Sequence, residues 1–494
     1  MRKPDTVLDC VLPFVRAKKW AILAISAILL VPCYWHRRIE AGDLASHVYN
    51  AWLAQLIEKG QAPGLYISKQ WNNFLFDVAL LQCGKLLGLA AAEKIVVGGC
   101  VLVFFWGAFA LLAAVGQRAP WFLVPCLAML AYGWTFNIGF FNYYLSLGLG
   151  FFATAIFWHG RGMDLIAGFA LAVLVFVAHP QGFLWLVGCV SYVLLWRKLP
   201  GRTKFWLPAV AAGAIVAARA YLFHRYEAYS VWESFGPGVY NGSDQLALYG
   251  TRFYVLSGVA LLFGVVCFAG DAVRRRGHQS WEALRLPCEL HLVAVFATYL
   301  LPDVLRIPLY SGWIGALALR LTTVSAAMGL AVLALMQPKK WHTLGFAGIA
   351  ALFFAFLYQD SGVLNRMEQQ AERLVSGLPS GERVTATIWS PPDSRLPFIG
   401  HIVDRACIGR CFSFQNYEPA SGQFRVRVRE GSPVATDDPD TSQSMEAGEY
   451  VVRPEDLPMA QLYQCDEKDL TQLCVRQLAA GEANGRIGHH PASP

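Results

Sequence analysis

"WAILAISAILLVPCYW", residues 20–35, is an apolar run that directly follows Arg16, Lys18 and Lys19. A helix that crosses a bilayer needs roughly 20 predominantly apolar residues, whereas a secretory leader ends at a small-residue cleavage site. This run ends in "CYWH" and shows no such site. We therefore expect residues 20–35 to be retained as a first transmembrane segment, with the basic N-terminus on the cytoplasmic side.

The composition of the whole chain is that of a polytopic membrane protein. Of its 494 residues, 55% are hydrophobic and only 15% are charged, while soluble domains are about 25% charged. The formal net charge is +7, and its positive excess lies in residues 1–359, which hold 28 basic and 15 acidic side chains. Residues 360–494 hold 13 basic and 19 acidic ones. This distribution predicts a lipid bilayer as a partner and no nucleic acid.

Further apolar runs predict a polytopic α-helical membrane protein with about eleven transmembrane helices. The candidate spans lie at about residues 20–35, 94–116, 120–137, 141–159, 163–178, 181–196, 203–222, 252–270, 289–305, 313–336 and 340–358.

The loops between these spans carry a charge pattern that predicts their orientation, because short cytoplasmic loops collect Lys and Arg. With the N-terminus inside, every predicted inner loop contains at least one basic residue: "GQRAP", "HGRGMD", "RKLPGRTK", "DAVRRRGHQSWEALR" and "QPKKWH". This agreement requires residues 73–90, which include Asp77 and Lys85, to form an interfacial or re-entrant helix that does not cross. The first outer loop is then 36–93, and everything after Tyr358 lies outside.

Residues 360–482 are predicted to form a small extracytoplasmic α+β domain after a transmembrane domain of residues 1–359. The runs "RVTATIWS", "FRVRVRE" and "EYVVRP" alternate as strands do, and helix-like runs lie at 361–377 and 468–480. The last residues, 483–494, are expected to be disordered.

Four of the twelve cysteines lie in this C-terminal domain, at Cys407, Cys411, Cys465 and Cys474. Outside the cytoplasm such a set predicts up to two disulfides, with three possible pairings. A metal on the closely spaced pair is the alternative, although no second close pair accompanies it. The sequence defines no metal-ligand set and no certain cofactor, and a divalent metal stays open.

Directly after the first span, "EAGDLASHVYNAWLAQLIEKGQAPGLY" (40–66) predicts an amphipathic helix on the outer surface, because apolar residues recur at helical spacing from Leu44 and Gly60 ends the pattern. Asp43 stands at the entry of this helix and His47 follows one turn later, so the two side chains can share a face. Asp43 is therefore a candidate catalytic residue. The alternative is an N-cap whose oxygen accepts a backbone N–H.

Other polar residues stand at the same predicted membrane edge. Asn137 and Asn142 bracket an outer turn in "WTFNIGFFNYYLSLG", and His179 and Gln181 stand at the next outer turn in "FVAHPQGFLW". Polar and ionisable groups at membrane depth are costly and are candidates for a functional site. His179 has a structural alternative, which is to satisfy a helix end.

Charged residues in two later outer segments complete the candidate set. Arg320 lies about two turns inside its predicted helix, where its planar guanidinium would suit the phosphate of a lipid carrier. Arg306 lies nearby, and an internal pair between Arg320 and Asp303 is the alternative. Glu227, in the long outer loop, is a candidate second carboxylate or a solvated surface residue.

This plan resembles the GT-C superfamily of integral-membrane glycosyltransferases. The resemblance rests on a first span followed by an outer loop with an early acid in "EAGDLASH", on "GFFNYYLSLGLGFF" and "AHPQG", and on the tail segment "CIGRCFSFQNYEPASGQFRVR". It covers the general plan of residues 20–360. The tail shows no WWDYG-like signature, which disfavours an oligosaccharyltransferase, and Leu44 follows Asp43 where many members carry a second acid, which disfavours a bound metal.

The resemblance implies an enzyme that moves a sugar, with inversion, from a polyprenyl-phosphate donor to a glycan, lipid or protein acceptor on the non-cytoplasmic face. It assigns the catalytic base to Asp43, with His47 beside it. It also implies a bacterial inner membrane and a periplasmic C-terminal domain. We expect His179, Gln181, Asn137, Asn142, Arg306, Arg320 and Glu227 to bind substrate.

Two other classes of function remain open. A lipid or glycan transporter or flippase would show paired discontinuous helices in two related halves, and the sequence shows no such halves. A non-catalytic assembly or sensor protein predicts that Asp43, His47, His179 and Arg320 do not converge on one cavity.

Overall fold

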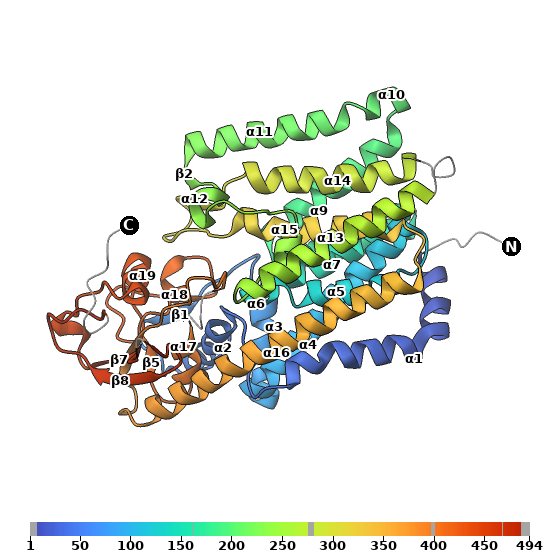
Figure 1. Cartoon of the computed structure of the whole chain (residues 1–494). Coiled ribbons are helices and arrows are strands. Elements are labelled where there is room, and N and C mark those ends of the chain that lie inside the picture. The colour runs from blue at the N-terminus through green and yellow to red at the C-terminus, as the bar shows by residue number, and fades with distance from the viewer. Residues whose placement is uncertain (1–6, 161, 275–280, 397–400, 467, 486–494) are drawn as a thin grey trace.

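The computed structural model describes residues 7–160, 162–274, 281–396, 401–466 and 468–485. Long helices run side by side along one axis, with the N-terminus at one end and a small C-terminal domain at the other (Figure 1). The longer helices are α1 (Val7–Tyr34), α2 (Leu44–Glu58), α3 (Leu75–Leu87), α4 (Leu89–Gly116), α7 (Phe141–His159), α8 (Met163–Ala178), α9 (Pro180–Lys198), α11 (Leu207–Arg225), α13 (Thr251–Arg274), α14 (Trp281–Leu300), α15 (Leu317–Ala334) and α16 (Lys340–Ser376). The shorter ones are η1 (Trp121–Leu123), α5 (Val124–Ala131), α6 (Trp134–Asn137), α10 (Gly201–Lys204), α12 (Val231–Phe235), η2 (Ser243–Leu246), α17 (Ile402–Ala406), α18 (Glu418–Ser421), α19 (Pro439–Ala447) and η3 (Pro454–Asp456).

Within the described residues, seven helices are long and apolar enough to cross a membrane: Val15–Tyr34, Leu89–Gly116, Gly201–Arg225, Thr251–Arg274, Glu282–Leu300, Leu317–Ala334 and Lys340–Ser376. The chain is thus a mostly helical protein with membrane-like helices, as predicted. The count of about eleven spans is not confirmed. The basic α10 lies at the end of the helices where the N-terminus lies, opposite the C-terminal domain (Figure 1).

One predicted span does not form a single helix. Residues 120–137 fold as η1, the eight-residue α5 and the four-residue α6, and an eight-residue helix rises only about 12 Å. The apolar run breaks at Gly133, where a side chain would meet the backbone of Gln245. Hydropathy alone cannot detect this break, because the residues around it are buried and mostly apolar.

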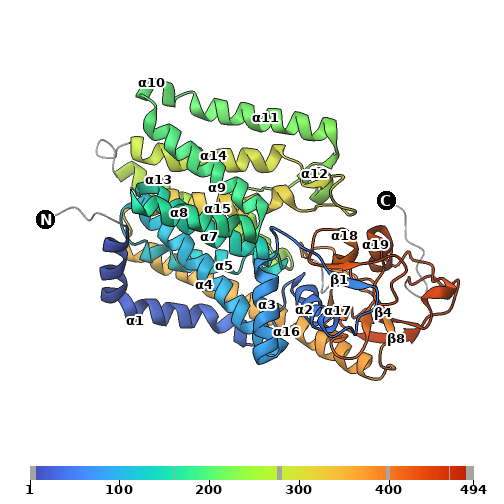
Figure 2. The ribbon, with the colours of Figure 1, turned by 180° about the vertical axis from the view of Figure 1, so that it is seen from behind.

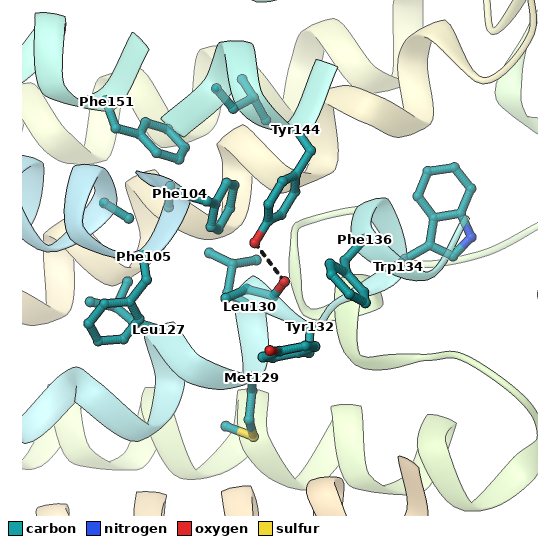
Figure 3. Packing of buried hydrophobic residues seen from close by; sticks show 14 of the residues in the cluster. Phe104, Phe105, Leu127, Met129, Leu130, Tyr132, Trp134, Phe136, Tyr144 and Phe151 are labelled. Atoms are coloured by element: carbon teal, nitrogen blue, oxygen red, sulfur yellow. Dashed lines mark hydrogen bonds between the residues drawn. The ribbon is translucent and has the colours of Figure 1, made fainter. Parts of the chain in front are cut away.

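The core of the helical part is aromatic. Phe104 of α4 stacks on Tyr144 of α7 with ring centroids 4.3 Å apart, and Phe151 meets Phe104 edge-on (Figure 3). The hydroxyl of Tyr144 donates a hydrogen bond to the carbonyl of Ala131, 2.8 Å away. This bond satisfies a carbonyl at the end of the short α5, which otherwise would be left unpaired among apolar side chains.

The C-terminal domain is built on a four-stranded sheet with the order β5-β4-β7-β8. Its strands are β4 (Arg383–Thr387), β5 (Phe412–Ser413), β7 (Met459–Gln464) and β8 (Leu473–Gln477). β4 runs parallel to β5 and β7, while β7 and β8 are antiparallel. The helix predicted at 468–480 is therefore wrong, because Leu473–Gln477 form β8 and the rest of that range is not helical. "EYVVRP" forms an isolated bridge at Val451 instead of a strand.

Two further strand pairs tie the outer segments together. β1 (Leu65–Ile67) of the first outer loop pairs antiparallel with β6 (Val426–Val428) of the C-terminal domain. β2 (Glu227–Tyr229) pairs antiparallel with β3 (Val304–Arg306). The first outer loop is thus tied to the C-terminal domain, and the loop after α11 is tied to the loop after α14, at the same end of the helices (Figure 2).

The first outer loop and the C-terminal domain share one hydrophobic core. Tyr49 and Leu53 of α2 belong to the same buried cluster as Val384 of β4 and Met367 of α16. The prediction of an amphipathic helix on the outer surface is wrong, because the polar face of α2 is also covered. Ser46 donates a hydrogen bond to Glu418, 2.9 Å away. The polar face of α2 therefore contacts the C-terminal domain.

The predicted boundary at residue 359 falls inside α16, which continues without a break to Ser376 and carries the chain from the apolar helices into the C-terminal domain. At the other end, Asn484 is buried and donates a hydrogen bond to Met445, 2.8 Å away. Asn484 of the predicted disordered tail is therefore packed, and residues 486–494 of that tail lie outside the described residues.

The cysteines of the C-terminal domain form two disulfides, Cys407–Cys411 and Cys465–Cys474. This selects one of the three predicted pairings. Both sulfurs of the closely spaced pair are used in a disulfide, so the alternative of a metal on that pair is wrong.

Candidate active site

A cavity of about 880 Å³ lies between the helices and the C-terminal domain. Six of the predicted site residues line it: Asp43, His47, Asn142, His179, Gln181 and Arg320. They come from four segments that are far apart in sequence. Their convergence on one cavity is the opposite of the scatter that a non-catalytic assembly protein predicts.

The position of Asp43 is set by a close backbone contact between two loops. Its backbone N–H donates a hydrogen bond to Ile138, 3.0 Å away, in the turn before α7. Gly42 and Gly139 allow this approach, since a Cβ on either would overlap the backbone of the other loop, and Gly139 has a φ of +91°. Only glycine adopts that φ readily.

Asp43 occupies the N-cap position of α2, but its side chain makes no capping hydrogen bond. The structural alternative for Asp43 therefore does not hold. Its carboxylate is instead directed to the C-terminal domain: Oδ1 lies 3.5 Å from Nε2 of His401, and Oδ2 accepts a hydrogen bond of 3.4 Å from the hydroxyl of Tyr417. Sequence reasoning missed both partners, because more than 350 residues separate them from Asp43 in the chain.

His47 lies between two carboxylates. Its Nδ1 is 2.7 Å from Asp77 of α3 and 3.7 Å from Glu418 of α18. Burial lowers the pKa of His47, but the two carboxylates outweigh burial and raise the pKa to about 9. His47 is therefore a cation at neutral pH and cannot accept a proton as a general base.

Glu418 is the least solvated member of this group. Burial, followed by the nearby Asp77 and Asp43, raises the pKa of Glu418 to about 8, although the His47 cation acts in the opposite direction. Glu418 was not identified from the sequence. The signal was present in "CFSFQNYEPAS", where a polar run precedes a short helix, but no periodicity connects it to the first outer loop.

The two predicted asparagines have different surroundings. Asn142 lines the cavity, and its amide donates a hydrogen bond of 2.9 Å to Asp77 while its carbonyl oxygen accepts one from the backbone of Phe76. Asn137 is not among the residues that line the cavity. Its amide donates to the carbonyl of Tyr132, 2.7 Å away, at the end of α5. Asn137 thus stabilises the break in the predicted span.

Arg320 lies on the first turn of α15 and is partly buried beside aromatic rings. Its guanidinium carbon lies 4.0 Å from the ring centre of Phe140. Its Nε is buried and has no hydrogen-bond partner in the described part of the chain. A buried guanidinium donor without an acceptor costs free energy unless a ligand supplies the acceptor.

His179 is the N-cap of α9, and its Nδ1 accepts a hydrogen bond of 3.1 Å from the backbone N–H of Gln181. The structural alternative for His179 is thus confirmed for one ring nitrogen. Burial and the neighbouring Arg320 lower the pKa of His179 well below its usual value, so the ring is neutral. A neutral ring that accepts at Nδ1 carries its proton on Nε2, which lies 3.5 Å from Nη1 of Arg320.

Gln181 completes this part of the cavity. Its amide nitrogen donates a hydrogen bond of 2.6 Å to the carbonyl of Leu317, and its buried Oε1 has no partner among the described residues. The predicted alternative of an Arg320–Asp303 ion pair is absent from the described part of the chain. Asp303 instead accepts a hydrogen bond of 2.9 Å from the backbone N–H of Leu319.

Arg306 and Glu227 do not line the main cavity. They are register partners on β3 and β2 and line a neighbouring cavity of about 640 Å³. Asp437 and Asp438 of the C-terminal domain line the same space. Tyr310 lines both cavities, so the second one borders the first on its outer side.

The rest of the main cavity is apolar. Its wall is formed by side chains of four helices that face one another beyond Arg320: Leu184, Trp185 and Cys189 of α9, Ala211, Ala214 and Ile215 of α11, Leu290, Val293 and Ala294 of α14, and Leu321, Val324 and Met328 of α15. α11 lies outermost among them (Figures 1 and 2). The cavity thus joins a polar end beside the C-terminal domain to an apolar end among candidate membrane spans.

No group of three or more histidine, cysteine, aspartate or glutamate side chains in the described ranges is arranged to hold a metal ion. Comparisons with protein families, with curated proteins and with solved structures found no match to this chain.

Proposed function

We propose that this chain is a membrane glycosyltransferase of the GT-C type that moves a sugar from a polyprenyl-phosphate carrier to an acceptor on the non-cytoplasmic face. The observation that carries this proposal is the shape of the main cavity. Its apolar part suits a polyprenyl chain, its polar part suits a sugar, and the partly buried Arg320 lines the same cavity. A guanidinium and an imidazole N–H in this cavity suit the two oxygens of a phosphate.

The proposed reaction is a single displacement with inversion. Asp43 takes the proton of an acceptor hydroxyl while the acceptor oxygen bonds to the anomeric carbon of the sugar. The bond from that carbon to the phosphate oxygen breaks, and its electron pair stays on the phosphate. Arg320 and the Nε2–H of His179 stabilise the charge that develops on this oxygen.

Three supporting residues have roles that follow from their surroundings. The His47 cation, paired with Asp77, donates to hydroxyl or phosphate oxygens and does not act as a base. Asn142 holds Asp77 in place. Tyr417 brings a hydroxyl from the C-terminal domain to Asp43, and both Asp43 and Arg320 act on it electrostatically.

The membrane orientation is part of the proposal. The C-terminal domain would lie outside a bacterial inner membrane, in the periplasm. Two disulfides in this domain suit an oxidising compartment. The acceptor is a glycan, a lipid or a protein.

The test is to reconstitute the purified protein in vesicles with a panel of radiolabelled polyprenyl-phosphate sugars and native membrane extract as the source of acceptors. We expect consumption of one donor, and loss of at least a hundredfold of the rate in Asp43→Asn or Arg320→Ala. Arg219→Ala is the matched control, because Arg219 also lies in a membrane helix and donates to the carbonyl of Leu300, but is not among the residues that line the cavity. Movement of a donor across the vesicle without its consumption would support a flippase instead.

A further inference from the structure

We infer that His401, supplied by the C-terminal domain, is a positioning residue for Asp43: its ring bridges Asp43 and Asp404 and holds the Asp43 carboxylate at the polar end of the main cavity. The inference rests on the proposed function, in which Asp43 is the base. It makes the C-terminal domain a working part of the active site.

The geometry of the bridge defines the protonation of the ring. Nε2 of His401 lies 3.5 Å from Oδ1 of Asp43, and Nδ1 lies 3.3 Å from Oδ2 of Asp404. Both distances are those of ion pairs, and a carboxylate can only accept, so the ring can serve both carboxylates only with a proton on each nitrogen. Burial lowers the pKa of His401, yet Asp404 and Asp43 together raise it well above its usual value.

The far side of the bridge is rigid. Asp404 is buried in α17, and the hydroxyl of Ser413 on β5 donates a hydrogen bond to its other oxygen. The Cys407–Cys411 disulfide closes the turn that directly follows α17. Asp404 therefore cannot follow a movement of Asp43, and the imidazolium fixes Asp43 relative to the sheet of the C-terminal domain.

Other groups face His401 from the remaining elements around it. The ring of Tyr417 lies with its centroid 5.4 Å from that of His401, and its hydroxyl donates to the second oxygen of Asp43. Glu446 of α19 acts electrostatically on His401, and burial raises the pKa of Glu446 to about 7. Up to three carboxylates thus surround one imidazolium, which favours the charged ring at neutral pH.

Asp43 has donors on both of its oxygens, and both come from the C-terminal domain. Oδ1 faces His401 and Oδ2 faces Tyr417, so the plane of the carboxylate is fixed. A base must lie within hydrogen-bond reach of the proton that it takes, and a displacement of about 1 Å can cost a hundredfold in rate. Loss of the His401 contact should therefore lower the turnover number and leave donor binding unchanged.

An amide can replace one ring nitrogen at a time. His401→Gln places an N–H near the position of Nε2, facing Asp43, and His401→Asn places an N–H near the position of Nδ1, facing Asp404. We expect H401Q to retain kcat within about tenfold and H401N to lose about a hundredfold, with the donor KM unchanged in both. Equal kcat in the two variants, or a higher kcat in H401N, would overturn the inference.

The matched control is His159→Gln, because His159 is exposed at the far end of α7 and bonds to the carbonyl of Ala114.

A pH profile separates positioning from a purely structural role. In the wild type kcat should fall at alkaline pH as His401 and His47 lose their protons, and in H401Q only the fall caused by His47, near pH 9, should remain. Thermal unfolding midpoints identify a variant that has failed to fold. In that case the protonation of the His401 ring in the wild type tests the inference.

Ring protonation is measured by nitrogen NMR of protein labelled in its histidine rings, with the His401 signal identified by its absence in H401Q. We expect both nitrogens of His401 to be protonated at neutral pH. A neutral ring would overturn the bridge whatever the activity. If the wild type consumes no lipid-linked sugar, the proposed function fails, and a doubly protonated His401 would still support the bridge between Asp43 and Asp404.

Discussion

Nη1 of Arg320 lies 3.5 Å from Nε2 of His179, and both atoms are hydrogen-bond donors. The ring of His179 cannot accept from Arg320, because its Nδ1 already accepts from the backbone of Gln181. The two donors face each other in a part-buried site, and the described residues offer neither of them an acceptor. An anion with two oxygens, such as the phosphate of a lipid carrier, would accept from both.

Arg320→Gln should therefore weaken donor binding. Loss of a charge-assisted hydrogen bond to a phosphate costs about 1.5–3 kcal/mol, which corresponds to a rise in Kd of roughly tenfold to a hundredfold. The measurement is the binding of a fluorescent polyprenyl phosphate, which needs no acceptor and no turnover. Arg219→Gln should bind as the wild type does, and an unchanged Kd in Arg320→Gln would contradict the anion site.

The sequence predicted the half of the site that belongs to the helices. Asp43, His179 and Arg320 stand next to membrane spans, where any polar residue is conspicuous against apolar neighbours. His401 and Tyr417 lie in a segment of ordinary polarity, where nothing in the composition marks them. They reach Asp43 through contacts between distant segments, such as the pairing of β1 with β6 across more than 350 residues, and such a pairing has no local signal.

The errors in the predicted fold have the same origin. The polar face of α2 reads as a solvated face in the sequence, but Ser46 meets Glu418 there. The pattern at 468–480 suits a helix, but pairing with β7 and the Cys465–Cys474 disulfide make it a strand. Contacts between distant segments override local propensity in both places.

The pair of His47 with Asp77 should make stability depend on pH. The folded pKa of about 9 exceeds the usual value of 6.5. The stabilisation is therefore complete below pH 6.5 and is lost as pH rises to about 9. It amounts to at most about 3 kcal/mol. Glu418 also has a raised pKa, of about 8, so its ionisation lowers the stability of the fold further in the lower part of this pH range.

His47→Gln should flatten this decline. The measurement is the thermal unfolding midpoint in detergent as a function of pH, compared between the wild type and the variant. His159→Gln serves as the control, because that ring is exposed. A wild-type midpoint that stays constant from pH 6.5 to about 9 would show that His47 is not held as a cation.

Arg405→Met should destabilise the contact between the C-terminal domain and the helices. The guanidinium lies 2.9 Å from Glu368 of α16 and 3.9 Å from Glu93 of α4, and all three side chains are buried. Without Arg405 these carboxylates are left without a counterion, which costs about 3–5 kcal/mol. Arg37→Met, which removes a half-exposed pair with Glu372, should cost less than about 1 kcal/mol. Similar unfolding midpoints in the two variants would contradict the buried network.

The predicted orientation is tested by labelling introduced cysteines in intact cells with a membrane-impermeant maleimide. Glu430→Cys lies on an exposed loop of the C-terminal domain, and Arg202→Cys lies on the exposed α10 at the opposite end of the helices. We expect labelling of Glu430→Cys only, and labelling of both after permeabilisation. The wild type reports the background from native cysteines, and the reverse pattern would place the C-terminal domain in the cytoplasm.

The apolar end of the cavity is tested by filling it. Gly188 lines the cavity on α9, and a Cβ there meets no atom within 4 Å, so a larger side chain enters open space. Gly188→Phe should leave the fold intact and remove room for several carrier methylenes, each worth about 0.8 kcal/mol when buried. The KM for a long-chain donor should then rise about tenfold or more, and the KM for a short-chain donor should stay unchanged. Gly258→Phe on α13 is the matched control, because that position is equally open but lies away from the cavity. Equal effects on long and short donors would mean that the lipid chain does not occupy this end.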